Sequence, residues 1–377
     1  MHVGIVTRSQ VDYALDLAHQ LSEEGVAVTL YMDHSRTAQE VGDADHPIER
    51  IREVGILPPT CRVRLLRLPR MRDPRSITVF RGLKREMQRD GVELAHILLN
   101  DGEIWLAVLA GLLTDVPVAT NLIIPVANFG DRLPRSAVWA INKLAVLGSD
   151  LVIVNGGEQL RLVKRLYGVP ESRLAHIPLS MHTRAAKWRV MEVEEDPDTV
   201  LFFGRAHPHK GLEYLVRAQP LISRQVPRAR FLISAHGEDL ARCRRMIRDQ
   251  SKFEIIEGFV PGDVMASLFQ RATLVALPYL TASTSGVLLT AFSFGKIVVA
   301  SRVGCLAEYV EDGVRGLLVT PGSTSELADA IVRMLLDAVL RQRMGANARS
   351  WVTQRQKGIT NQLLGAYGRA VSLHRKA

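Results

Sequence analysis

The chain has 377 residues, of which 47% are hydrophobic and 23% are charged, and this composition is typical of a soluble protein with more than one core. Its 48 basic and 39 acidic residues give a net charge of +9. The longest apolar stretch, residues 105–113, is too short to cross a bilayer, and residues 1–10 lack the pattern of a signal peptide. Cys61, Cys243 and Cys305 form no CxxC pair, which argues against a zinc site or a disulfide framework and predicts a cytoplasmic protein.

The first half of the chain alternates short β-rich runs with amphipathic helical runs. Helices are predicted at residues 11–25, 103–113, 136–148 and 158–168. Strands are predicted at residues 2–7, 26–32, 94–99, 117–124, 151–154 and 173–179. This alternation predicts a parallel sheet with helices on both faces. His96 falls inside a predicted strand, where a histidine is more often a core residue than a catalyst.

The alternation breaks at residues 180–198, which are polar and end in Asp-Pro-Asp, so this segment is predicted to be a linker. A second series of strands follows at residues 199–204, 229–235, 253–259, 273–279, 296–301 and 316–320. Helices are predicted between these strands, across 325–350 and again at 351–374. We therefore predict an α/β protein with two doubly wound, Rossmann-like domains facing a cleft, in which ligands bind at the carboxyl ends of the strands.

A basic segment lies within the first half. Ten basic and only two acidic residues occur from Arg62 to Arg89. Such a segment favours an anionic membrane surface or a phosphorylated ligand, although an ordinary solvated surface explains it equally well. Nucleic acid is not expected as a partner, because Phe80 is the single aromatic residue there and no nucleic-acid module is recognisable.

The clearest local signal is "LFFGRAHPHKGLEYLVRA", residues 201–218. A predicted strand ends at Gly204, Arg205 follows, and Lys210 stands at the start of a helix. Two cations beside a helix N-terminus form an anion site, and a diphosphate fits such a site. The structural alternative is an Arg and a Lys that face solvent around an ordinary turn.

Three further turns join a strand to a helix along the same predicted sheet edge. Gly237 lies in the first of them, and Phe259 and Val260 in the second, where they offer a flat apolar surface for a base unless they belong to the core. In the third turn, residues 285–287 (Ser285, Gly286 and Val287) begin a short apolar helix, and their backbone N–H groups are predicted to point into the cleft.

These pieces occur in the order "FFGR…KG", "GFV" and "LPY…SGV…AFSFGK", which resembles the donor-binding half of retaining glycosyltransferases of family four with the GT-B fold. The resemblance covers residues 199–340. It implies transfer of a sugar from a nucleoside diphosphate to an acceptor with retention, without metal or other cofactor. Arg205 and Lys210 would then hold the diphosphate, and the backbone of residues 285–287 would contact sugar and phosphate.

The resemblance also implies a domain division. Residues 1–180 would form the acceptor-side domain, 181–198 the linker and 199–350 the donor-binding domain. Residues 351–377 would form a helix that crosses back to the N-terminal domain. Together with the basic segment Arg62–Arg89, the donor half favours the hypothesis that the acceptor is a glycan or a lipid-linked molecule of the cell envelope, reached at the inner face of the membrane.

The sequence departs from the family at positions that orient the sugar. The family usually carries two glutamates eight residues apart, and these positions hold Ala282 and Thr290 here. Thr290 is still able to bond a ribose hydroxyl, but more weakly than a carboxylate would. Where relatives often have His-Asp and a second histidine, a short comparison anchored at Pro125 gives Ile123, Ile124 and Asn128.

Replacement groups are available in the first half. Asn100, Asp101 and Glu103 follow the strand predicted at 94–99, and Asp131 follows "NFG". We select Asp101 and Asp131 as acceptor-side catalytic candidates, with helix capping as the structural alternative.

Two other functions compete with transfer. A GT-B protein that has lost catalysis, and that binds a nucleotide or glycan or serves as a partner subunit, would explain Ala282 and Thr290. A nucleotide-sugar epimerase of the same fold is disfavoured, because its acid–base carboxylates and histidines have no assignable counterparts here.

Overall fold

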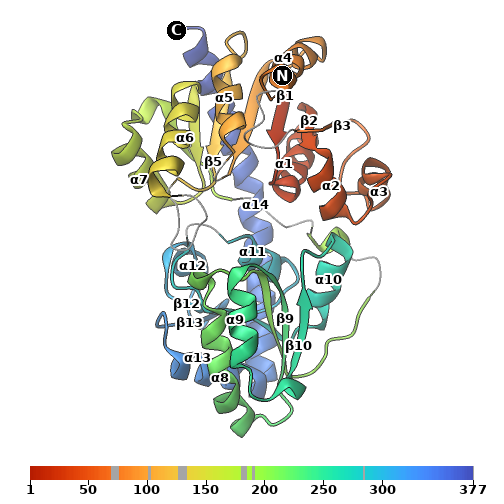
Figure 1. Ribbon diagram of the computed structural model, residues 1–377, viewed down its shortest axis with the longest axis vertical. Coiled ribbons are helices and arrows are strands. Elements are labelled where there is room, and N and C mark those ends of the chain that lie inside the picture. Colours follow the sequence, from red (N-terminus) through yellow and green to blue (C-terminus); the bar gives the residue numbers. More distant parts are fainter. Residues whose placement is uncertain are drawn as a thin grey trace. The chain divides into compact units, whose positions relative to one another are not determined.

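The computed structural model describes residues 1–68, 76–100, 103–125, 134–179, 185–188, 192–282 and 285–376. The chain divides into two compact units (Figure 1). Of the described residues, those up to 179 and those from 356 to 376 form the first unit, and those from 185 to 355 form the second. Each unit is built around one parallel sheet.

The first unit contains a seven-stranded sheet in the order β3-β2-β1-β4-β5-β6-β7. Its strands are β1 (His2–Thr7), β2 (Ala27–Asp33), β3 (Arg62–Leu66), β4 (Leu94–Leu99), β5 (Val118–Leu122), β6 (Leu151–Val154) and β7 (Leu174–His176). Every pairing is parallel. The central strands are apolar and buried because helices cover both faces.

The helices of this unit follow the strands in turn. They are α1 (Val11–Glu23), α2 (His34–Val41), α3 (Pro47–Glu53), α4 (Ser76–Arg89), α5 (Ile104–Leu112), α6 (Arg135–Leu147), α7 (Gly157–Tyr167) and the short 3₁₀ helix η1 (Glu171–Arg173). One core includes buried residues of α4, α5, α6 and α7. The segment Arg62–Arg89, for which the sequence predicted no elements, contains β3 and α4.

The second unit contains a six-stranded parallel sheet in the order β10-β9-β8-β11-β12-β13. Its strands are β8 (Thr199–Arg205), β9 (Arg230–His236), β10 (Phe253–Glu257), β11 (Leu274–Leu277), β12 (Val298–Ser301) and β13 (Gly316–Val319). In both sheets the strand order reverses beside the first strand of the unit. The prediction of two doubly wound parallel sheets is confirmed.

In the described part of the second unit, one short helix precedes the first strand in the sequence, and the other helices follow the strands. Together they are the 3₁₀ helices η2 (Ala185–Trp188), η3 (Pro208–Lys210) and η4 (Gln250–Lys252), and the α-helices α8 (Leu212–Gln225), α9 (Glu238–Met246), α10 (Gly262–Arg271), α11 (Gly286–Ser293), α12 (Gly304–Tyr309) and α13 (Thr324–Leu336). Trp188 of η2 is buried against α10, where a Cβ on Gly262 would lie 2.4 Å from its ring. Residues 192–198 also bond to this unit, since Asp196 pairs with Arg271 at 2.7 Å.

The last helix differs from its prediction. The sequence predicted a helical break near residue 350, whereas α14 runs without interruption from Ala338 to His374 and supplies residues to both units. Gly345 lies within this helix and serves close packing, because a Cβ there would lie 2.2 Å from the carbonyl oxygen of Gly295.

His96 is a core residue, as predicted. It is fully buried on β4, and its Nδ1 lies 2.7 Å from the hydroxyl of Tyr367 on α14. Burial lowers the pKa of His96 to about 3, so its ring is neutral at physiological pH. The three cysteines are free and buried. Among the described residues, no helix has both the length and the apolar character needed to cross a membrane.

Candidate nucleotide-sugar site

The cationic turn lies at the carboxyl end of β8. Gly204 and the exposed Arg205 end this strand, and η3 leads through Lys210 into α8. Gly211 caps η3 with a φ of +67°, and its Cα lies so close to Pro278 that an added Cβ would stand 1.9 Å from the Pro278 carbonyl oxygen. The Lys210 ammonium lies 3.9 Å from the centre of the Tyr279 ring. The turn is therefore packed tightly against the end of β11.

Two histidines stand between the cations. The rings of His207 and His209 are stacked with their centres 5.7 Å apart, and His209 is buried. His207 Nδ1 lies 3.6 Å from a carboxylate oxygen of Glu238, at the start of α9.

The second turn, at Gly237, touches the first. Ala206 donates its N–H to the carbonyl of His236 at 2.7 Å, and Asp239 donates its N–H to the carbonyl of Ala206 at 3.0 Å. Gly237 has a φ of +135°, and a Cβ there would lie 2.7 Å from the carbonyl oxygen of Ala206. Glycine is therefore required by both conformation and space.

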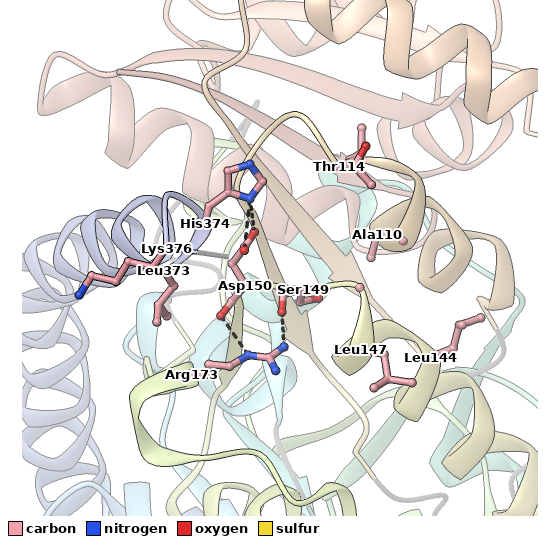
Figure 2. A pocket seen from close by; sticks show the side chains of 13 residues that line it. Ala110, Thr114, Leu144, Leu147, Ser149, Asp150, Arg173, Leu373, His374 and Lys376 are labelled. Atoms are coloured by element: carbon pink, nitrogen blue, oxygen red, sulfur yellow. Dashed lines mark hydrogen bonds and ion pairs between the residues drawn. The ribbon is translucent and has the colours of Figure 1, made fainter.

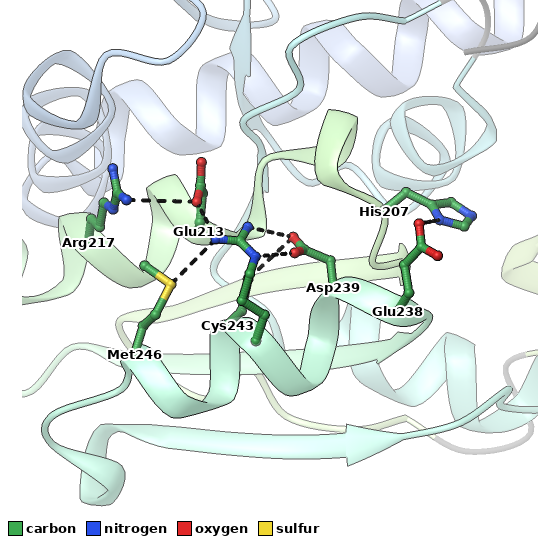
Figure 3. A network of polar contacts seen from close by, with 8 residues as sticks. His207, Glu213, Arg217, Glu238, Asp239, Cys243 and Met246 are labelled. Carbon is green, nitrogen blue, oxygen red and sulfur yellow. Dashed lines mark hydrogen bonds and ion pairs between the residues drawn. The ribbon is translucent and has the colours of Figure 1, made fainter. Parts of the chain in front are cut away.

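A polar network around the buried Asp239 and the partly exposed Arg242 supports these two turns (Figure 3). Arg242 donates to the Asp239 carboxylate at 2.5 and 3.1 Å, and to Glu213 of α8 at 2.6 Å. Asp239 is 3% exposed. The Asp239 and Glu213 carboxylates raise the pKa of the Arg242 guanidinium, so the arginine remains charged. This network ties the start of α9 to α8 behind the cationic turn.

The third turn carries Phe259 and Val260, which are both partly exposed. Phe259 lies edge-on to His236, with ring centres 6.1 Å apart. Because neither residue belongs to the closed core, both are accessible to a flat ring at the sheet edge.

The fourth turn begins α11. Ser285 caps this helix by accepting the N–H of Leu288 at 3.3 Å, and Gly286 and Val287 form its first turn. Val287 lies beside β8, since its Cγ2 would be 3.6 Å from a Cβ on Gly204. The structure thus brings together Gly204, Arg205, Lys210 and the N-terminus of α11, where free N–H groups and the helix dipole favour an anion.

Two of the positions that depart from the family pattern, Ala282 and Thr290, lie close to this turn. Thr290 is 2% exposed and donates its hydroxyl to the carbonyl of Gly286 at 3.0 Å, so only its acceptor capacity remains for a ligand. The Ala282 carbonyl accepts the N–H of Cys305 at 3.3 Å, in a tight contact with α12. In the first unit Ile123 is buried. Asn128, Asp101 and Asp131 lie outside the described residues.

A polar cluster marks the carboxyl edge of the first sheet. Glu103 is buried and accepts the Ser9 hydroxyl at 2.7 Å and the Asn100 N–H at 2.8 Å. Glu103 lines a small pocket together with Arg8 and Trp105. Within the described part of the chain, the buried Trp105 Nε1 and Asn100 Oδ1 lack a hydrogen-bond partner. The sequence had named Asn100 and Glu103 as replacement candidates, but it gave no sign of Trp105.

A larger pocket of about 690 Å³ lies at the opposite edge of this sheet (Figure 2). His374 approaches both oxygens of Asp150 at 3.2 Å, and Arg173 donates to the carbonyls of Val146, Ser149 and Asp150. These groups satisfy one another at the amino ends of the strands. Because ligands of doubly wound sheets bind at the carboxyl ends, we do not assign this pocket to the site.

Two family models match the chain. One, described as glycosyltransferase family 4, matches residues 10–184, and the other, described as glycosyl transferases group 1, matches residues 197–337. Together they cover most of the chain. The chain belongs to the family-four glycosyltransferases.

Two curated relatives of this glycosyltransferase show how far its sequence similarity extends. An alpha-D-kanosaminyltransferase of Streptomyces kanamyceticus is 32% identical over 170 residues, which are 44% of this chain and 43% of the relative. A D-inositol 3-phosphate glycosyltransferase of Nocardia farcinica is 29% identical over 222 residues, which are 55% of this chain and 49% of the relative. The matched region thus spans about half the length of these relatives.

Solved structures establish the fold as GT-B. Sucrose-phosphate synthase from Thermosynechococcus elongatus has a TM-score of 0.73 at 20% identity over 98% of both chains. Anabaena HepE in complex with UDP-glucose has a TM-score of 0.71 at 16% identity, over 98% of this chain and 99% of HepE. Among the described residues of the glycosyltransferase, no group of three or more His, Cys, Asp and Glu side chains could hold a metal ion.

Proposed function

We propose that this chain transfers a sugar from a nucleoside diphosphate sugar to an acceptor with retention, without a metal. The observation that carries the proposal is the convergence of Arg205, Lys210 and the N-terminus of α11 at one sheet edge. The two curated relatives described above are both named transferases, and HepE was solved with UDP-glucose, which supports a catalytic role over a binding-only role.

The chemistry of transfer explains why these groups are suited to the site. As the bond between sugar and phosphate breaks, positive charge grows on the sugar and negative charge grows on the leaving diphosphate. Arg205 and Lys210 stabilise the leaving group electrostatically, and the N–H groups that begin α11 add fixed dipoles. Phe259 and Val260 offer the base an apolar surface. The roles of the individual residues remain predictions.

Calorimetric titration with UDP, GDP and TDP tests the proposal. We expect micromolar binding of one nucleotide and a loss of at least tenfold in affinity in Arg205→Ala, because a charge-assisted contact is removed. Arg224→Ala is the matched control, since Arg224 is exposed near the far end of α8. Absence of binding to all three nucleotides, or equal losses in both variants, would contradict the donor site.

The acceptor is proposed to bind at the carboxyl edge of the first sheet. Arg8, Glu103 and Trp105 line a small pocket at this edge, and the buried Asn100 Oδ1 and Trp105 Nε1 have no hydrogen-bond partner within the described residues. These groups support a polar acceptor such as a glycan. Trp105→Phe keeps the ring and removes the N–H, so we expect it to raise the KM for acceptor and leave nucleotide affinity unchanged.

We also propose that the acceptor belongs to the cell envelope and that the cytoplasmic protein meets the inner face of the membrane. On α4, Arg81, Arg85 and Arg89 are exposed at four-residue spacing, opposite the buried Phe80 and Met87. Such a stripe suits an anionic lipid surface, at about 1 kcal/mol for each residue. Reversing the three charges to Glu should abolish flotation with vesicles of phosphatidylglycerol, and unchanged flotation would reject the stripe.

A further inference from the structure

Tyr279 belongs to the stretch "LPY" of the family resemblance, but the resemblance assigns it no role at the site. It follows β11 and Pro278, is 1% exposed, and has the Lys210 ammonium 3.9 Å from its ring centre. At that distance the negative face of the ring attracts the ammonium. The ring therefore fixes the end of a side chain that has four rotatable bonds.

The backbone around Tyr279 makes the same connection. Leu280 donates its N–H to the carbonyl of His209 at 2.8 Å, directly before Lys210. The Pro278 carbonyl lies against Gly211, directly after Lys210. The loop that follows β11 thus holds the cationic turn on both sides of Lys210.

The Tyr279 hydroxyl faces the other half of the site. It forms a side-chain hydrogen bond with Ser285, the residue that caps α11. The phenol therefore contacts the helix N-terminus through its hydroxyl and the lysine through its ring. Both partners belong to the proposed diphosphate site.

We infer that Tyr279 is a positioning residue that holds the Lys210 ammonium and the N-terminus of α11 in one geometry for the diphosphate of the donor. This inference rests on the proposed function. An aromatic ring suits the task better than a carboxylate would, because it attracts the ammonium without adding a negative charge that repels the diphosphate. The ring and the hydroxyl make separable contributions.

Two substitutions separate the ring from the hydroxyl. Tyr279→Phe keeps the ring over Lys210, and Tyr279→Leu removes it. Each variant is titrated with UDP, GDP and TDP and with the matching nucleosides, which lack phosphate. We expect Tyr279→Leu to weaken nucleoside diphosphate binding roughly 3- to 30-fold and to change nucleoside binding by less than twofold. Tyr279→Phe should retain most of the diphosphate affinity of the unsubstituted chain.

A second measurement needs no nucleotide. Reductive ¹³C-methylation of the lysines gives an NMR signal for Lys210, assigned by its loss in Lys210→Arg. The ring should move this signal upfield in the unsubstituted chain and in Tyr279→Phe but not in Tyr279→Leu.

The outcomes distinguish the two claims. An unshifted Lys210 signal, or equal losses of nucleoside and diphosphate affinity in Tyr279→Leu, would overturn the positioning role and leave the proposed function standing. If the unsubstituted chain bound none of the nucleotides, the donor site itself would fail, and the inference would fail with it.

Discussion

Substitution of Gly211 by alanine tests the packing that shapes the cationic turn. Gly211 has a φ of +67°, a left-handed conformation that costs an alanine about 1 kcal/mol relative to glycine. The added Cβ would also lie 1.9 Å from the Pro278 carbonyl oxygen and 2.9 Å from its carbon, and both are backbone atoms. Relief of that overlap requires a backbone shift, which costs about 1–3 kcal/mol. The expected total destabilisation is about 2–4 kcal/mol.

Gly313 provides the matched control. It belongs to the same unit, has a φ of +75°, and has no atom within 4 Å of an added Cβ. Gly313→Ala should therefore cost only the conformational strain, about 1 kcal/mol. The entropy that alanine removes from the unfolded chain is the same in both variants and cancels in the comparison.

Urea unfolding, followed by circular dichroism, measures both variants against the unsubstituted chain, and nucleotide titration measures the site. Because Gly211 adjoins Lys210, we expect at least a tenfold loss of diphosphate affinity in Gly211→Ala and no loss in Gly313→Ala. If the two unfolding free energies differed by less than 0.5 kcal/mol, the contact with Pro278 would not constrain the turn, and the geometry described for the site would be refuted.

Three further predictions concern other parts of the chain. His96→Gln should flatten the pH dependence of the unfolding free energy. In the unfolded chain His96 gains a proton below a pKa of about 6.5, whereas in the folded chain it gains one only near 3, so between these values the stability of the unsubstituted chain falls by roughly 1.4 kcal/mol for each unit of decreasing pH. Urea midpoints measured at several pH values would show this slope in the unsubstituted chain and its loss in the variant. Asp239→Ala should lower the unfolding free energy by about 1–3 kcal/mol, since the Arg242 guanidinium loses its buried partner. Substitution of the exposed Glu238 by alanine should change the unfolding free energy by less than 0.5 kcal/mol, and equal unfolding midpoints for the two variants would contradict the prediction. Gly148→Ala should cost about 1–3 kcal/mol, because its Cβ would lie 2.5 Å from the N atom of Gly111, and Gly111→Ala, which meets nothing within 4 Å, should be nearly neutral in thermal melts.

The strands of both sheets could be predicted because buried parallel strands read as short continuous apolar runs. "LVIV" at residues 151–154 and "LAHILL" at 94–99 are strands with the predicted bounds. The strand and helix within Arg62–Arg89 were missed because the many charged residues of this segment, including the exposed face of α4, dominate its composition and obscure the apolar periodicity. In α14, only the neighbouring Gly295 carbonyl explains Gly345.

The site could be predicted in part. Arg205 and Lys210 were found because glycines and a helix start surround them in one short stretch. The contact of Lys210 with Tyr279 joins residues 69 positions apart, and the Ser9–Glu103 bond joins residues 94 positions apart, so no local pattern reveals either. The acceptor-side candidates Asp101 and Asp131 lie outside the described residues and stay predictions.

The burial of Trp188 on α10 has a consequence for chimaeras between relatives. A recombination point at Thr199, where the second sheet begins, would separate Trp188 from Gly262 and Asp196 from Arg271. A donor half exchanged at that point would carry a cavity the size of an indole, and its Arg271 would keep Glu254 as a partner but lose Asp196. A crossover before Ala185 keeps these contacts within one parent, so hybrids made there should be the ones that remain folded.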